Sequence, residues 1–152
     1  MFSLNELVFA VATPDILFHM NKEEIKRSPA IENSQARLSA HLLTQRSFYP
    51  LFPPPDREKL PVGLKGVGAG LDVPHHRLAD LIVTPDVLIV PSMLGMFAKV
   101  VEGVVVVNPG FASKPIGAGT WAEMRVKAMV PEEEGDVGHA VWERARVEVK
   151  RI

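Results

Sequence analysis

The feature that most constrains this chain is a set of β-branched runs in its second half. Residues 100–107 are valine throughout apart from Glu102 and Gly103, residues 81–83 are also apolar, and residues 87–90 form a further run. Runs that are continuously apolar, rather than alternating with polar residues, are typical of central strands covered on both faces. We therefore expect an α/β fold with a buried sheet.

Two later segments, residues 120–130 and 140–149, have a different pattern. In residues 120–130, Trp121, Glu123, Arg125 and Lys127 alternate with apolar neighbours. A period of two is typical of a strand with one face in solvent. We expect residues 120–130 and 140–149 to form a half-exposed antiparallel pair, joined by the acidic turn at 131–136.

The first half predicts one strand and two helices. Residues 2–11 are rich in leucine, valine and phenylalanine and are expected to form a strand. Thr13 is the expected cap of a short helix that ends near Met20, with Pro14 in its first turn. Asn33 or Ser34 caps a second helix, which ends near Arg46 because proline follows Tyr49.

A proline-rich connection separates the two halves. The 152 residues include 13 prolines, several of which cluster between positions 50 and 61. Residues 53–78 show little apolar periodicity and are expected to form a mobile loop. The length of the chain is typical of one domain, so residues 1–152 are predicted to form a single domain.

Composition excludes several classes of protein. The 17 basic and 18 acidic side chains give a net charge of −1, which disfavours a protein that binds nucleic acid by its own positive surface. The absence of cysteine excludes disulfides, thiolate metal sites and a cysteine nucleophile. The apolar runs at 87–90 and 104–107 have four residues each, far fewer than the roughly 20 needed to cross a bilayer, so no membrane partner is expected.

The sequence offers few candidate chemical groups. The five histidines lack metal-ligand spacing and are interpreted as solvent or loop residues. The glycines between positions 63 and 70 precede neither a Lys-Ser/Thr pair nor a clear helix, so they do not form a phosphate loop. Asn108-Pro109-Gly110 ends a buried strand, where α/β sheets place their sites, but its local chemistry favours a simple turn.

Four blocks of sequence carry a resemblance to a known family. They read Thr-Pro-Asp-Ile-Leu-Phe-His at 13–19, Leu-Leu-Thr-Gln-Arg-Ser-Phe-Tyr-Pro at 42–50, Thr-Pro-Asp-Val-Leu-Ile-Val-Pro-Ser at 84–92 and Val-Val-Asn-Pro-Gly at 106–110. Together with the end of the chain at 149–152, they resemble the late part of the B subunits of DNA polymerase alpha–primase. The resemblance covers nearly the whole chain except residues 56–78.

The resemblance implies a fold. It is the C-terminal half of a calcineurin-like phosphoesterase-type layered α/β sandwich, a mixed sheet with flanking helices. Active phosphoesterases of this type carry Gly-His-x-His after a strand, whereas here Pro91-Ser92-Met93-Leu94 follow residues 87–90. Neither catalytic residues nor a metal or other cofactor is therefore expected. The candidate structural or interaction residues are Thr44, Gln45, Arg46, Tyr49, Pro91, Ser92, Asn108 and Gly110.

The resemblance also implies a function, that of a non-catalytic accessory subunit in the nucleus that acts in replication initiation and primer synthesis. It would bind the C-terminal domain of the catalytic subunit of polymerase alpha, meet primase indirectly, and reach DNA only through the complex. Two alternatives remain: a diverged phosphoesterase with residual hydrolase activity, and a free-standing α/β interaction domain.

The resemblance implies that this sequence is a late piece of a longer protein or a gene model that starts late. Because such a piece would lack neighbouring strands, residues 104–107 are expected to present an unpaired apolar edge. An open edge of that kind favours self-association.

Overall fold

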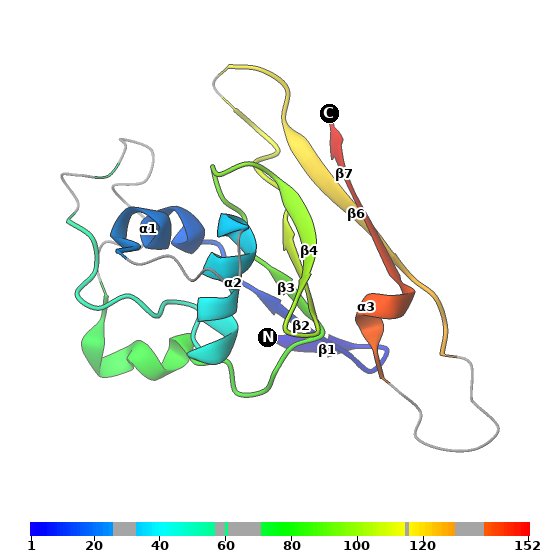
Figure 1. Cartoon of the computed structure of the whole chain (residues 1–152), viewed down its shortest axis with the longest axis horizontal. Coiled ribbons are helices and arrows are strands. Elements are labelled where there is room, and N and C mark those ends of the chain that lie inside the picture. Colours follow the sequence, from blue (N-terminus) through cyan, green and yellow to red (C-terminus); the bar gives the residue numbers. More distant parts are fainter. Residues whose placement is uncertain (26–32, 57–59, 61–70, 115, 130–138) are drawn as a thin grey trace.

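The chain forms two sheets and a helical layer. The computed structural model describes residues 1–25, 33–56, 60, 71–114, 116–129 and 139–152. Figure 1 shows the larger sheet between a layer of helices and a two-stranded sheet on its other face. Within the described residues, no helix is both long and apolar enough to cross a membrane.

The larger sheet is mixed, as the resemblance implied. Its strands run in the order β1-β2-β3-β5-β4. The central strands β2, β3 and β5 are parallel, and antiparallel strands pair with both sides of this group. The bounds are Phe2–Leu4 for β1, Leu7–Val11 for β2, Val87–Ile89 for β3, Phe97–Val101 for β4 and Val104–Asn108 for β5.

The most buried strand is the valine run predicted to be central. All five residues of β5 are buried, because β5 pairs with β3 and β4 at its two edges and is covered on both faces. Val104 and Val106 belong to the core beneath the helices, whereas Val105 and Val107 belong to the core beneath the second sheet. The expectation that residues 104–107 form an open apolar edge is therefore wrong.

Two helices cover one face of the larger sheet (Figure 1). Helix α1 spans Ile16–Glu23 and helix α2 spans Ser34–Thr44. Asn33 caps α2 as predicted, accepting a hydrogen bond from the Ala36 amide at 3.0 Å. The predicted Thr13 cap of α1 is wrong: the cap is Asp15, whose carboxylate accepts from the Phe18 amide at 3.1 Å.

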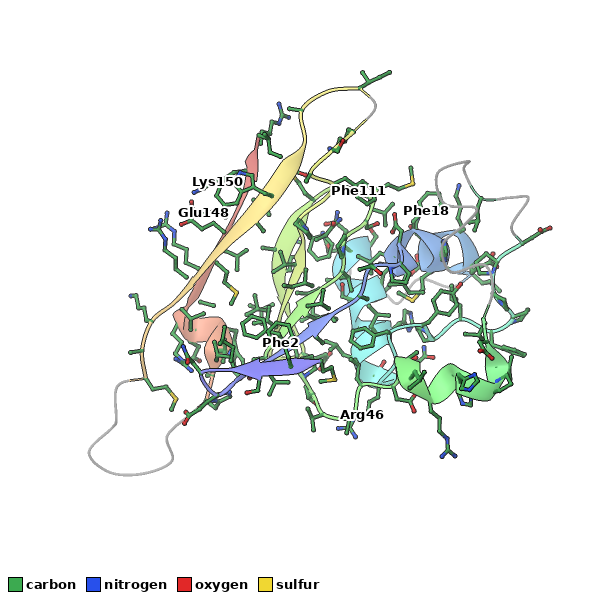
Figure 2. The ribbon with its side chains drawn as sticks, turned by 180° about the vertical axis from the view of Figure 1, so that it is seen from behind. Phe2, Phe18, Arg46, Phe111, Glu148 and Lys150 are labelled. Carbon is green, nitrogen blue, oxygen red and sulfur yellow. The ribbon has the colours of Figure 1, made fainter. Side chains whose placement is uncertain are left out.

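The opposite face is covered by the predicted antiparallel pair, β6 (Thr120–Val126) and β7 (Ala145–Arg151). Their apolar side chains pack on Val87, Val105 and Val107. Figure 2 views the molecule from behind and shows Glu148 and Lys150 on the side of this strand pair that lies away from the larger sheet. Residues 141–144 depart from the predicted strand, because they form a short helix, α3 (Val141–Arg144), before β7 begins.

Three further boundaries differ from the sequence prediction. Residues 2–11 form two strands rather than one, because Asn5 and Glu6 take left-handed conformations and reverse the chain. Glu102 and Gly103, with φ of 50° and 73°, reverse residues 97–108 into the β4–β5 hairpin in the same way. Residues 81–83 are not a strand: Leu81 is buried in the core, whereas Ile82 and Val83 are exposed.

Half of the predicted loop at 53–78 lies outside the described residues. The described part includes the 3₁₀ helix η3, Val73–Ala79, whose side chains are exposed or half-buried. Segment 46–48 runs beside the end of η3. The Phe48 amide donates to the Ala79 carbonyl at 2.7 Å, and the Leu81 amide donates to the Arg46 carbonyl at 2.8 Å.

Candidate functional site

The carboxyl ends of the three parallel strands meet at one edge of the larger sheet. Asp15 follows β2, Ser92 follows β3 and Asn108 ends β5, and their exposed fractions are 2%, 1% and 0%. Ligands of open α/β sheets bind at such an edge. These buried polar side chains therefore mark the place where a catalytic or binding group would be expected.

Asn108 uses its whole carboxamide to hold the neighbouring backbone. Its Oδ1 accepts from the amides of Ser92 and Gly110, both at 2.9 Å. Its Nδ2 donates to the carbonyls of Leu94 and Gly95 at 3.1 and 3.3 Å. The side chain thus links the end of β5 to the loop that follows β3 and to its own turn.

The other polar groups at this edge hold the same loop. The second carboxylate oxygen of Asp15 accepts from the Met93 amide at 2.7 Å, and the Ser92 hydroxyl accepts from the Leu94 amide at 3.1 Å. Gln35 of α2 donates to the Gly95 carbonyl at 2.7 Å. The backbone of 92–95 is therefore fixed from β5, α1 and α2 together.

Gly110 completes the turn after β5, as its local chemistry predicts. It has φ of 72°, a conformation that favours glycine. A Cβ at this position would lie 2.4 Å from the Thr120 hydroxyl at the start of β6, so the close packing also requires glycine. The turn interpretation of Asn108-Pro109-Gly110 thus has a geometric basis.

The predicted site residues fall into two groups. Pro91, Ser92, Asn108 and Gly110 come together at the carboxyl edge of the sheet. Thr44, Gln45, Arg46 and Tyr49 lie instead at the end of α2 and after it. Among the described residues, no three histidine, aspartate or glutamate side chains lie close enough to hold a metal ion.

The end of α2 turns sharply at Arg46. Thr44 donates its hydroxyl to the Ala40 carbonyl at 2.8 Å, and the Gln45 amide donates to the His41 carbonyl at 3.1 Å. Arg46 takes φ of 50°, which directs the chain toward the end of η3, and its side chain is exposed. Figure 2 shows Arg46 at the edge of the helical layer.

Tyr49 contacts a buried histidine that the sequence interpretation placed in solvent or a loop. His19 lies in α1 with 0% of its surface exposed, and its Nδ1 is 3.3 Å from the Tyr49 hydroxyl. Its Nε2 is buried, and the described residues provide no hydrogen-bond partner for it. Burial lowers the pKa of His19, although the nearby Asp15 charge opposes this shift. Burial, with the Glu23 charge, raises the pKa of Tyr49.

Asp15, His19 and Gln35 take part in these sites but were not among the predicted site residues. Asp15 has a sequence signal, since it follows Thr-Pro at the start of a helix and is itself a strong N-cap residue. His19 has only its place among apolar neighbours in α1, which does not distinguish a buried histidine from an exposed one without the contact to Tyr49.

The Asn108 network predicts a large effect of a small substitution. Asn108→Asp keeps an oxygen for the Ser92 and Gly110 amides but removes the donor that faces two carbonyls. It should lower the free energy of unfolding by about 3 kcal/mol, since a buried charge then faces unpaired acceptors. Urea unfolding measures this. Asn21→Asp, an exposed position on α1, is the control, and an equal loss in both variants would contradict the network's role.

The buried His19 predicts that stability falls in mild acid. The folded-state pKa lies below the ordinary value of 6.5, so below pH 6.5 the unfolded chain takes up a proton that the folded chain resists. The free energy of unfolding should be fully retained above this pH and fall by up to about 1.4 kcal/mol per pH unit below it. Comparison with His19→Gln between pH 5 and 8 isolates this slope, and the exposed His41→Gln serves as control. If the free energy of unfolding depends on pH equally in His19→Gln and in the original chain, His19 is not the cause of the loss in acid.

Comparison with known proteins gives the family. Residues 1–99 match the family of the B subunits of DNA polymerases alpha and epsilon. The whole chain is 43% identical to the DNA polymerase alpha B subunit of Schizosaccharomyces pombe, covering 26% of that protein. It is 33% identical to the B subunit of Saccharomyces cerevisiae, in an alignment that covers 97% of this chain and 25% of the relative. It is 36% identical to the B subunit of Mus musculus, in an alignment that covers 88% of this chain and 20% of the relative.

The chain spans about a quarter of the length of the curated relatives it matches. The identity nevertheless extends over the helical layer, the larger sheet and the second sheet, since the alignment with the fission yeast protein includes the entire chain. The resemblance that the sequence blocks indicated is confirmed, and the chain belongs to the family of DNA polymerase alpha B subunits.

Proposed function

We propose that this chain acts as a non-catalytic accessory part of the DNA polymerase alpha–primase complex in the nucleus. It binds the C-terminal domain of the catalytic subunit, contacts primase indirectly, and reaches DNA through the complex during replication initiation and primer synthesis. The observation that carries this proposal is the 43% identity to a polymerase alpha B subunit over the whole chain.

The carboxyl edge of the sheet supports a scaffold role. Both carboxylate oxygens of Asp15 accept backbone amides, and the Asn108 carboxamide makes four hydrogen bonds to backbone groups. The stretch Pro91-Ser92-Met93-Leu94 stands where, by the resemblance, active phosphoesterases carry Gly-His-x-His. The polar groups of this edge thus hold a loop in place, which is the function of a structural site.

We also propose that the fold is the C-terminal half of a calcineurin-like phosphoesterase-type sandwich. The support is the arrangement of layers: helices on one face of a mixed sheet and an antiparallel strand pair on the other. The net charge of −1 supports binding to protein rather than directly to DNA.

The proposed partner can be tested by co-expression. We expect the chain to co-elute in size exclusion with the catalytic subunit of polymerase alpha from the same organism. It should not co-elute with that subunit once its C-terminal domain is removed, which is the matched control. A chain that elutes alone in both cases would contradict the proposed partner.

The proposed absence of catalysis can be tested separately. The purified chain should not hydrolyse p-nitrophenyl phosphate with added manganese, because Asp15, Ser92 and Asn108 are engaged by backbone groups. Hydrolysis that depends on manganese and disappears in His41→Ala or His139→Ala would favour the diverged phosphoesterase instead. Activity that persists in both variants would come from a contaminant or from other residues, and the residues of this edge can then be tested in turn.

A further inference from the structure

A hollow of about 250 Å³ lies between α1, α2 and the segment that follows α2. Its floor is apolar: Met20 and Leu38 are almost fully buried, and Pro50 and Leu51 are half-buried. Its rim is mixed: the exposed polar side chains of Glu23, His41 and Gln45 line it, together with Glu24 and the exposed Ile25. The hollow is therefore suited to a group with an apolar body and a polar end.

The two neighbouring glutamates at the end of α1 differ in charge compensation. Glu24 is paired with Arg37 of α2, with the Arg37 Nη2 3.0 Å from the Glu24 Oε2, and both side chains are almost fully buried. Glu23 is exposed at the wall of the hollow, and no cation of the described residues forms an ion pair with it. The Glu23 charge also helps to raise the pKa of Tyr49 beyond the hollow. Among the described residues, Glu23 is thus the carboxylate lining the hollow that has no cationic partner.

A second hollow of about 300 Å³ adjoins the first. Pro50 and Leu51 line both, so this pair of residues forms a ridge between them. The second hollow also borders η3 and is lined mainly by apolar groups, including Phe52 and Val73, whose exposed fractions are 76% and 53%. An occupant that crosses the ridge and enters both hollows must be extended, as a polypeptide segment is.

We propose that these two hollows form a docking surface for an extended, basic polypeptide segment. An arginine or lysine side chain of the partner enters the first hollow, with its alkyl stem on Met20 and Leu38 and its cationic end toward Glu23. Such side chains bury their stems while their charge stays near solvent. An adjacent apolar side chain of the partner enters the second hollow. This inference goes beyond the proposed function, since it concerns the chemistry of a docked segment and not which protein supplies it.

The first hollow can be tested with n-butylguanidinium, which reproduces an arginine side chain with its stem. The full chain, labelled with ¹³C at the methionine methyl groups, offers Met20 as a reporter in the hollow. Met93 and Met96, which do not line the hollow, serve as internal controls. We expect a saturable shift of the Met20 methyl signal alone, in the millimolar range, which weakens as salt is added.

Glu23→Gln should weaken binding of n-butylguanidinium by about threefold to fivefold, the upper part of the range for a solvent-exposed ion pair. It should leave binding of the neutral analogue 1-pentanol unchanged. Glu143→Gln, which removes an exposed carboxylate from α3, is the matched control and should have no effect. A Met20 signal that does not respond, or equal binding of both probes that is insensitive to Glu23→Gln, would overturn the proposal.

The second hollow is tested with the peptide acetyl-Leu-Arg-Leu-amide. It should bind more tightly than n-butylguanidinium and should also shift the backbone amide signals of Val73 and Ala79, which line that hollow. Because these measurements use the isolated chain, their outcome is independent of co-elution with the polymerase catalytic subunit. Binding of the peptide without any shift at Val73 and Ala79 would overturn the polypeptide part of the proposal.

Discussion

The carboxamide of Asn108 makes the contacts on which the arrangement of the carboxyl edge of the sheet depends. A single planar group accepts two amides and donates to two carbonyls, so it sets the distance between the end of β5 and the loop after β3. The same side chain forms the turn at Gly110, from which the chain leads to β6. Asparagine can do this because its amide carries both an acceptor and a donor, whereas aspartate and leucine, which have similar size, lack one or both.

The polar groups distinguish two regions of the molecule, the carboxyl edge of the sheet and the hollows of the helical layer. At the carboxyl edge, where an α/β sheet usually binds its ligand, the buried polar atoms bind backbone, and the loop at 92–95 is fixed. The open hollows lie instead in the helical layer, on both sides of Pro50 and Leu51. The edge where an α/β fold usually carries its site and the proposed docking surface are thus separate on this chain.

The sequence predicted the parts of the fold that depend on local pattern. The valines of β5 indicated a buried central strand, and the alternation around Trp121 indicated the β6–β7 pair. Turns that rest on left-handed Glu6 and Glu102 were missed, because glutamate has no particular preference for that conformation and the strand pairing imposes it. The burial of His19 was missed for a related reason, since it depends on Tyr49, which is 30 residues away along the chain. At the site, Asn108 and Gly110 were singled out correctly as neighbours in a turn, but the loop that Asn108 holds depends on tertiary contacts.

The position of β5 also determines how the molecule opens. Strand β5 is paired along both edges and covered on both faces, whereas β1 and β4 each have one unpaired edge in the larger sheet. Backbone amides exchange with solvent only when their hydrogen bonds open, and the segments with the most buried contacts open last. Protection from hydrogen exchange should therefore increase from β1 and β4 toward β3 and β5. The valine run would be the last part of the chain to lose its structure.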